Sequence, residues 1–287
     1  MRIGADVGGS AVKLICTDDG GNVLSMRRYA SDGSAEHLAE ELKTLAGDAS
    51  LDEARITVTG VGSGLFGKLP CKTEYISEFE AFSRGGQIIA HKENALIVSM
   101  GTGTAFVMAR RDKYDYLGGS GVGGGTLCGL SLLTTGEGNI YNIKDMTRLG
   151  NTSNVDLTVG DISVGDVGLP ADLTAANFGK ADIDDSEYDI AAGLANMIYQ
   201  SVGVMAAFAL KGTDVKTAVF VGAMSEFDVG AGMLRAVGGL HGYEFIMPRC
   251  GAFAGAYGCA VTGLGEDSIT AAIEREMEKI RNGAGKY

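Results

Sequence analysis

The chain has 287 residues, of which 45% are hydrophobic and 21% are charged, so it is long enough to bury a core and to form two lobes. A formal net charge of −12 argues against nucleic acid and anionic membrane as partners, because no basic stripe is available to neutralise phosphates. Three scattered histidines and five cysteines without C-x-x-C spacing give no metal-binding pattern, and such isolated thiols fit a reducing, cytoplasmic compartment. No secretory pattern precedes the first strand and no apolar run approaches about 18 residues, so we expect neither secretion nor a membrane span.

The first third of the chain predicts a three-stranded meander, because short turn sequences at 7–10 and 18–21 separate its apolar runs. Leucines 38, 42 and 45 then recur at helical spacing. The expected elements are strands at 2–6, 11–17 and 22–29, a helix at 35–46, a strand at 55–59 and a helix at 78–92.

The same order restarts near residue 94, which predicts a duplicated α/β architecture. We expect an N-terminal lobe over residues 1–93 and a C-terminal lobe over 94–287, on either side of a shared cleft. An apolar helical stripe begins at Ser186-x-x-Asp189, a sequence that resembles a capping box. The expected elements are strands at 95–99, 105–110 and 216–221, a helix over 127–133, a long helix over 186–210, a Gly- and Ala-rich helix over 252–264 that can approach neighbouring backbone closely, and a charged helix from 265 on.

Two turns carry residues suited to phosphate. Asp6-x-Gly8-Gly9-Ser10 combines a carboxylate at a strand end, glycines whose N–H groups can face an anion, and a hydroxyl group, and Lys13 adds a cation. Alone, this sequence fits an ordinary hairpin equally well. Gly101-Thr102-Gly103-Thr104 repeats the pattern at the start of the second lobe, and the two matching turns favour phosphate binding.

The segment 118–125 contains six glycines and precedes a predicted helix. Its N–H groups are therefore expected at a helix N-terminus, where an anion or nucleotide can pack, although a purely structural glycine loop remains an alternative. Dinucleotide-type G-x-G-x-x-G matches also occur at 62–67 and 119–124. We interpret both as chance, since Pro70 interrupts any helix after the first and the second lies inside the glycine run.

Phosphoryl transfer to an alcohol needs a group that accepts or orients the hydroxyl proton. Glu78, at the predicted start of a helix, is the candidate base. The alternative is that Glu78 only complements the helix dipole, an effect of about 0.3–1 kcal/mol. Spacing alone leaves both interpretations open.

In chain order, these segments resemble type II pantothenate kinases of the staphylococcal and eukaryotic type over nearly the whole length. The most specific string is 172–179, because sugar kinases and actin-like ATPases share the phosphate turns. The matching segments are Gly4–Ser10 with Lys13, Glu78–Ala81, Gly101–Thr104, Gly118–Gly125, Asp172–Gly179 and Gly251–Ala256.

The resemblance implies an actin-like, sugar-kinase-like (ribonuclease H-like) fold in a homodimer. It implies transfer of the γ-phosphate of ATP, with Mg²⁺, to the primary hydroxyl of pantothenate, the first step of coenzyme A biosynthesis. Glu78 matches the catalytic base, and Asp6 would hold the metal through a water. The implied nucleotide contacts are Asp6, Gly8, Gly9, Ser10, Lys13, Thr102, Gly103, Thr104, Gly123, Gly124, Gly125 and Cys128, and the implied substrate contacts are Glu78, Thr102, Tyr116 and Ala175.

One departure concerns the acceptor. The family usually has an arginine just before the Gly-Gly of the glycine-rich segment, where this chain has Tyr116-Leu117. A tyrosine lacks the charge and the bidentate fork of a guanidinium. The stretch before Gly251 also lacks the tyrosines that the resemblance leads us to expect near the pantothenate pocket, and Arg249 is a candidate to compensate there. Two alternatives therefore stay open: a nucleotide-binding sensor without kinase activity, and a kinase for another small alcohol or a sugar. An activating ATPase of the dehydratase-activator kind would need paired cluster-ligating cysteines, which the sequence lacks.

Overall fold

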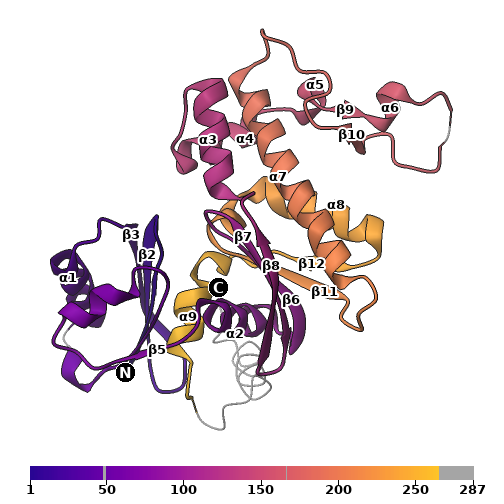
Figure 1. Ribbon diagram of the computed structural model, residues 1–287. Helices are drawn as coiled ribbons and strands as arrows, with labels where there is room; N and C mark the ends of the chain where they lie inside the picture. Colours follow the sequence, from indigo (N-terminus) through magenta and orange to yellow (C-terminus); the bar gives the residue numbers. More distant parts are fainter. Residues whose placement is uncertain (48–49, 166, 265–287) are drawn as a thin grey trace.

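The computed structural model describes residues 1–47, 50–165 and 167–264, and shows two lobes that are each built on a five-stranded sheet (Figure 1). The charged helix expected from residue 265 on lies outside the described residues. In the first sheet, a three-stranded antiparallel meander is extended by two parallel strands in the order β3-β2-β1-β4-β5. These strands are β1 (Arg2–Val7), β2 (Ala11–Thr17), β3 (Val23–Ala30), β4 (Arg55–Thr59) and β5 (Thr73–Tyr75).

Helix α1 (Ala35–Ala46) covers one face of this sheet with its three leucines, which are all buried, as the helical spacing predicts. Ser34 caps it by accepting a hydrogen bond from the backbone N–H of His37. Two short 3-10 helices, η1 (Leu51–Glu53) and η2 (Ser63–Lys68), connect α1 to β4 and β4 to β5.

The second sheet repeats the first. Its order is β12-β11-β6-β7-β8, again an antiparallel meander extended by two parallel strands, so the predicted duplication is confirmed. The sequence did not reveal β5, β8 or β12, all of which lie at sheet edges, where strands are short or half-exposed and show weak hydrophobic alternation. The strands are β6 (Asn94–Met100), β7 (Thr104–Arg110), β8 (Lys113–Ser120), β11 (Thr217–Val221) and β12 (Glu244–Ile246).

Two helices exchange lobes at the centre of the molecule. Helix α2 (Glu78–Ala90) follows β5 but packs on the second sheet, whereas α9 (Ala254–Ala260), after the 3-10 helix η4 (Gly251–Phe253), packs on β1. The two helices touch backbone to backbone, since a Cβ at Gly258 would lie 1.9 Å from the carbonyl oxygen of Ala81. The close approach predicted for the Gly- and Ala-rich segment is thus confirmed, although the helix ends at Ala260. The division at residue 93 stays a prediction.

The second lobe carries a cap of helices above its sheet, α3 (Gly124–Thr135), α4 (Ile140–Leu149), α7 (Glu187–Leu210) and α8 (Asp228–His241), with the 3-10 helix η3 (Ala223–Glu226) before α8. Among the described residues, α7 is long and apolar enough to cross a membrane, but more than half of its apolar window is buried, so it is a core helix. Ser186 caps it. The expected capping box is wrong, because the Asp189 carboxylate accepts from the backbone N–H of Asn151 at 2.6 Å instead.

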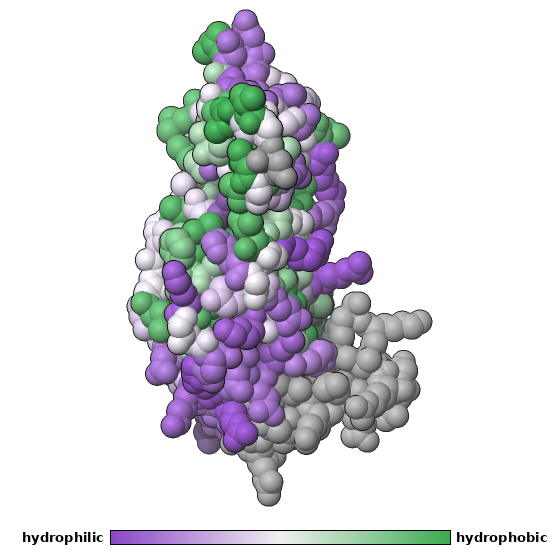
Figure 2. All heavy atoms as spheres, turned by 90° about the vertical axis from the view of Figure 1, so that its right-hand side faces the viewer, coloured by the Kyte–Doolittle hydropathy of each residue, from purple (hydrophilic) through white to green (hydrophobic). Residues whose placement is uncertain are grey.

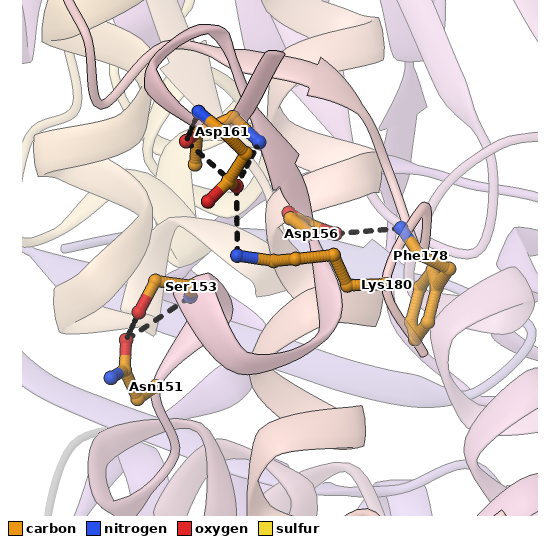
Figure 3. Close-up of polar contacts among 7 residues, drawn as sticks. Asn151, Ser153, Asp156, Asp161, Phe178 and Lys180 are labelled. Atoms are coloured by element: carbon orange, nitrogen blue, oxygen red, sulfur yellow. Dashed lines mark hydrogen bonds and ion pairs between the residues drawn. The ribbon is translucent and has the colours of Figure 1, made fainter. Parts of the chain in front are cut away.

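Residues 151–165 and 167–185 form an arm that projects from this cap, away from the first lobe (Figure 1). A buried carboxylate holds the arm in place: Asp156 accepts from the backbone N–H of Phe178 at 2.8 Å (Figure 3). It also accepts from Asn196 of α7 at 2.7 Å. Nearer the tip, Lys180 bonds Asp161 at 2.8 Å. The arm contains α5 (Thr152–Val155), β9 (Leu157–Thr158), α6 (Val159–Ile162) and β10 (Thr174–Ala176).

Candidate active site between the two lobes

A cleft of about 1100 Å³ lies between the lobes and brings together most of the predicted site residues. Two of them, Gly123 and Ala175, are not among the described residues that line it. Ala175 is exposed on β10 of the arm, and Gly123 caps α3 next to the cleft. The predicted residues that line the cleft are Asp6, Gly8, Gly9, Ser10, Lys13, Glu78, Thr102, Gly103, Thr104, Tyr116, Gly124, Gly125 and Cys128.

The first of the two turns predicted to bind phosphate, the first phosphate turn, is the hairpin between β1 and β2. The pairing register sets Asp6 opposite Lys13, and the Lys13 ammonium lies 3.7 Å from the Asp6 carboxylate. Helix α9 begins directly behind this carboxylate, since a Cβ at Gly255 would lie 2.7 Å from Asp6 Oδ2. Burial therefore raises the pKa of Asp6, and the neighbouring Lys13 opposes that shift.

The second phosphate turn lies between β6 and β7 and meets the first across the cleft. Ser10 Oγ is 3.4 Å from Thr102 Oγ1, so the hydroxyls of the two lobes are within hydrogen-bonding distance. The paired arrangement inferred from the sequence is therefore present in space.

The glycine-rich segment supports this second turn. The N–H groups of Gly124 and Gly125, expected to face an anion, instead donate at 2.8 Å to the carbonyls of Gly101 and Thr102. A Cβ at Gly123 would lie 2.8 Å from the backbone of Gly103, so the segment must be glycine for the turn to pack on it. The sequence predicted a helix over 127–133, whereas α3 begins earlier, at Gly124, and residues 118–120 belong to β8. The sequence also could not show that the first N–H groups of the helix are already used.

Glu78 begins α2 at the rim of the cleft. Ser77 caps the helix by accepting from the backbone N–H of Phe79, which fixes the first turn. Burial raises the pKa of the Glu78 carboxyl, the negative charge of Asp6 raises it further, and Lys13 lowers it. A carboxylate that binds its proton more tightly than usual, beside two phosphate turns, is suited to accept a proton from an incoming hydroxyl.

Tyr116 lies on β8 beside this carboxylate. Its ring stacks on Phe79, with the centroids 4.4 Å apart and the planes 12° apart, and half of its surface remains exposed to the cleft. Arg249, the candidate to compensate for the missing tyrosines before Gly251, is not among the described residues that line the cleft.

Sequence reasoning missed several residues at the other end of the cleft, namely Arg28, Tyr29, Tyr141 and the segment Gly222–Met224. Gly222 follows the buried strand β11, a signal like those used for the two phosphate turns. Arg28 was harder to find, because a bulge between Cys16 and Thr17 shifts the pairing of β2 with β3. Counting outward from the turn at 18–21 would therefore have paired the wrong residues.

Comparison with known proteins agrees with this geometry. Residues 87–228 match the family model described as Fumble. A protein named type II pantothenate kinase from Bacillus anthracis is 30% identical over 233 residues, covering 77% of this chain and 82% of the relative. One of the same name from Oceanobacillus iheyensis is 32% identical over 231 residues, covering 77% and 83%.

Solved structures share the fold at low identity. An activator of 2-hydroxyisocaproyl-CoA dehydratase from Clostridium difficile, with bound ADPNP, superposes with a TM-score of 0.63 at 16% identity, over 100% of this chain and 98% of the other. A ROK family glucokinase from Streptomyces griseus, in complex with glucose and AMPPNP, gives 0.62 at 12% identity, over 90% and 97%. The predicted two-lobed, actin-like and sugar-kinase-like fold is therefore confirmed.

Proposed function

The chain belongs to the type II pantothenate kinase family, and on that premise we propose that it transfers the γ-phosphoryl group of ATP to the primary hydroxyl of pantothenate, the first step of coenzyme A biosynthesis. The observation that carries the proposal is the position of Glu78, which shares one cleft with phosphate turns from both lobes. That combination is what a kinase for a small alcohol requires: anion sites for the donor and a proton acceptor for the nucleophile.

The residues present fit ATP with Mg²⁺. Gly9, Ser10, Thr102 and Gly103 line the cleft with backbone and hydroxyl groups suited to the phosphates, and Lys13 supplies a positive charge beside them. The N–H of Gly8 and the hydroxyl of Thr104 already donate within the chain, to the carbonyl oxygens of Ala11 at 3.1 Å and Val122 at 2.7 Å. Mg²⁺ usually takes one or two carboxylates plus phosphate oxygens, and Asp6 is a partly buried carboxylate that lines the cleft at this place, where it would hold the ion through a water. When bound, the ion would neutralise charge on the transferred group.

Glu78 would accept the hydroxyl proton of the acceptor as the oxygen attacks phosphorus. Its raised pKa makes it a better proton acceptor than a free glutamate, and Lys13 helps to keep it ionised until the acceptor arrives. The acceptor would lie at the Glu78 end of the cleft, in contact with Thr102 and with the exposed part of Tyr116.

We further propose a cytoplasmic homodimer in which the arm meets a second copy of the chain. The arm exposes apolar side chains: Ile162 is 59% exposed, Ile183 is 94% exposed and Val164 is fully exposed. Figure 2 shows apolar surface gathered on this part of the molecule. Ala175, distant from the cleft of its own chain, would then contact the acceptor of the partner subunit. An exposed apolar patch of this kind is typical of an interaction surface.

The test is an ADP-release assay with ATP, Mg²⁺ and pantothenate on the wild type and on Glu78→Gln. Glu78→Gln should lower kcat by about 10²–10⁴-fold while ATP binding is retained. Glu80→Gln is the matched control, because Glu80 lies in the same helical turn but lies 3.8 Å from Arg84. Full activity in Glu78→Gln would remove Glu78 as the base. Hexoses outcompeting pantothenate, or ATP binding without turnover on any such alcohol, would contradict the proposed reaction.

A further inference from the structure

Arg28 links the two lobes at one end of the cleft. It lies on β3 of the first lobe, and its Nη1 donates to Glu226 Oε2 of η3, in the second lobe, at 2.6 Å. Its guanidinium carbon also lies 5.4 Å from the ring centroid of Tyr141 of α4, a cation–π distance. One side chain of the first lobe thus has two separate anchors in the second.

The strand register fixes the direction in which Arg28 points. Asp6 pairs with Lys13, and Lys13 pairs with Arg28, so the three residues form a row across β1, β2 and β3. Residues that pair directly across antiparallel strands lie on the same face of the sheet. Arg28 therefore shares the face of the Asp6–Lys13 phosphate site, and all three line the cleft.

The strand order places Arg28 and Glu78 at opposite ends of the cleft. Arg28 is on β3, at one edge of the first sheet, and Glu78 follows β5 at the other edge, with the phosphate turn of β1 and β2 between them. If the acceptor hydroxyl is at Glu78 and the transferred phosphate is at the turns, the rest of ATP must extend toward Arg28.

The Arg28 end has the lining that a nucleoside needs. Ile140, Tyr141, Cys128 and the segment Gly222–Met224 give it aromatic, apolar and small residues. The Nε–H of Arg28 is buried and has no acceptor among the described residues, so the guanidinium has a donor left for a ligand oxygen.

We propose that Arg28 is a nucleotide-positioning residue: held by Glu226 and Tyr141, it keeps the lobes together over the nucleoside end of the cleft, and its guanidinium donates to a ribose or phosphate oxygen that reaches it when ATP binds. The inference rests on the proposed function for the direction of the bound ATP. Glu226 and Tyr141 act through Arg28, because they fix the orientation of its guanidinium group.

The test measures the Kd of AMPPNP by calorimetry on the full chain, since this readout needs no acceptor. Arg28→Met should raise the Kd and the KM for ATP by about ten-fold, while the KM for pantothenate stays within about two-fold. Arg28→Lys keeps the charge but loses the fork, and should lose less affinity than Arg28→Met.

Arg27→Met is the matched control. Arg27 is the neighbouring residue on the same strand, its side chain points to the opposite face, and it lies 4.0 Å from Glu41 of α1. It should leave the Kd unchanged, and equal melting temperatures for the two variants would exclude a difference in folding. Glu226→Gln should weaken AMPPNP binding in the wild type but add little to Arg28→Met, because the pair acts as one unit.

Equal Kd values for Arg28→Met and Arg27→Met would overturn the inference, and so would an effect confined to the KM for pantothenate, which would place Arg28 at the acceptor end. Additive effects of Arg28→Met and Glu226→Gln would also overturn it. A wild type that binds AMPPNP but does not phosphorylate pantothenate would contradict the proposed function alone, and the Kd comparison would still decide the role of Arg28. A wild type that does not bind AMPPNP would overturn both.

Discussion

Phe79 and Tyr116 stack face to face, with 4.4 Å between ring centroids, and Phe79 is the residue that follows the candidate base Glu78. The stack joins the first turn of α2 to β8, so the ring of Tyr116 acts as a support for the helix start that carries the carboxylate. Two features of Tyr116 can therefore be tested separately: the stacking of its ring on Phe79, and the absence of the positive charge that the family's arginine would supply.

Removing the ring of Tyr116 should make the position of the Glu78 carboxylate less fixed. Tyr116→Ala is expected to lower kcat by about ten-fold and to reduce the melting temperature by a few degrees, since such aromatic pairs contribute about 0.5–1.5 kcal/mol beyond their buried area. Tyr116→Phe keeps the stack and should retain both values. If Tyr116→Phe lost as much activity as Tyr116→Ala, the hydroxyl and not the stacking would be responsible.

Adding the missing charge should change acceptor binding. In Tyr116→Arg, a guanidinium group would face the acceptor end of the cleft, where the carboxylate of pantothenate can pair with it. We expect the KM for pantothenate to fall by about three- to ten-fold, and the KM for an uncharged acceptor such as pantetheine to stay unchanged. Steady-state kinetics with both acceptors provide the measurement, and an equal change for the two would show that charge is not the cause.

The rate should depend on pH through Glu78. Because burial and the charge of Asp6 raise the pKa of this carboxyl, the acid limb of kcat/KM should lie above the ordinary pKa of 4.5, with activity rising as the proton is lost. The effect on stability is the opposite. A carboxyl whose pKa is higher in the folded state than in the unfolded state lowers the free energy of unfolding as the pH rises through the interval between these two pKa values.

Glu78→Gln should therefore melt at a higher temperature than the wild type at pH 7, and at an equal temperature below pH 4. Thermal unfolding at both pH values is the measurement. A melting temperature at pH 7 that is lower than that of the wild type would contradict the raised pKa.

The contact between the exchanged helices should not tolerate a methyl group. Gly258→Ala would place a Cβ 1.9 Å from the carbonyl oxygen of Ala81, so we expect a loss of at least about 1–3 kcal/mol in the free energy of unfolding. Gly232→Ala is the control, because this exposed glycine of α8 has open space around it, and it should gain about 0.5–1 kcal/mol. Denaturant titration of both variants measures the difference, and equal effects would show that the helices can move apart.

The arm should depend on Asp156. Asp156→Ala removes the acceptor for the backbone N–H of Phe178, and leaves Asn196 with its weaker bond to Thr174 Oγ1 at 3.2 Å. We expect protease cleavage within the arm to become at least about ten-fold faster, and the proposed homodimer to weaken in sedimentation experiments. Asp184→Asn, at an exposed position of the same arm, should behave as the wild type. An unchanged dimer with a loosened arm would place the interface elsewhere.

The sequence revealed the parts of the site in which a residue suited to bind phosphate lies at a turn that the local sequence also predicts. Asp6 lies near the end of the buried strand β1, two residues before Gly8, and Thr102 follows the buried strand β6 between two glycines, so their turns could be located without coordinates. Arg28 lies on a half-exposed edge strand beside Arg27, and two adjacent arginines there indicate only a solvated face. Its role depends on the elements that lie opposite it across the cleft, η3 and α4, and the local sequence does not show which elements these are.

The exchange of α2 and α9 also sets how the two halves depend on each other. Each sheet is covered by a helix that the other half of the chain encodes, so neither half could keep its apolar face covered if it were produced alone. The two lobes are therefore complementary parts of one folding unit, and we expect a motion that opens the cleft to turn about the glycine-lined crossing of these two helices.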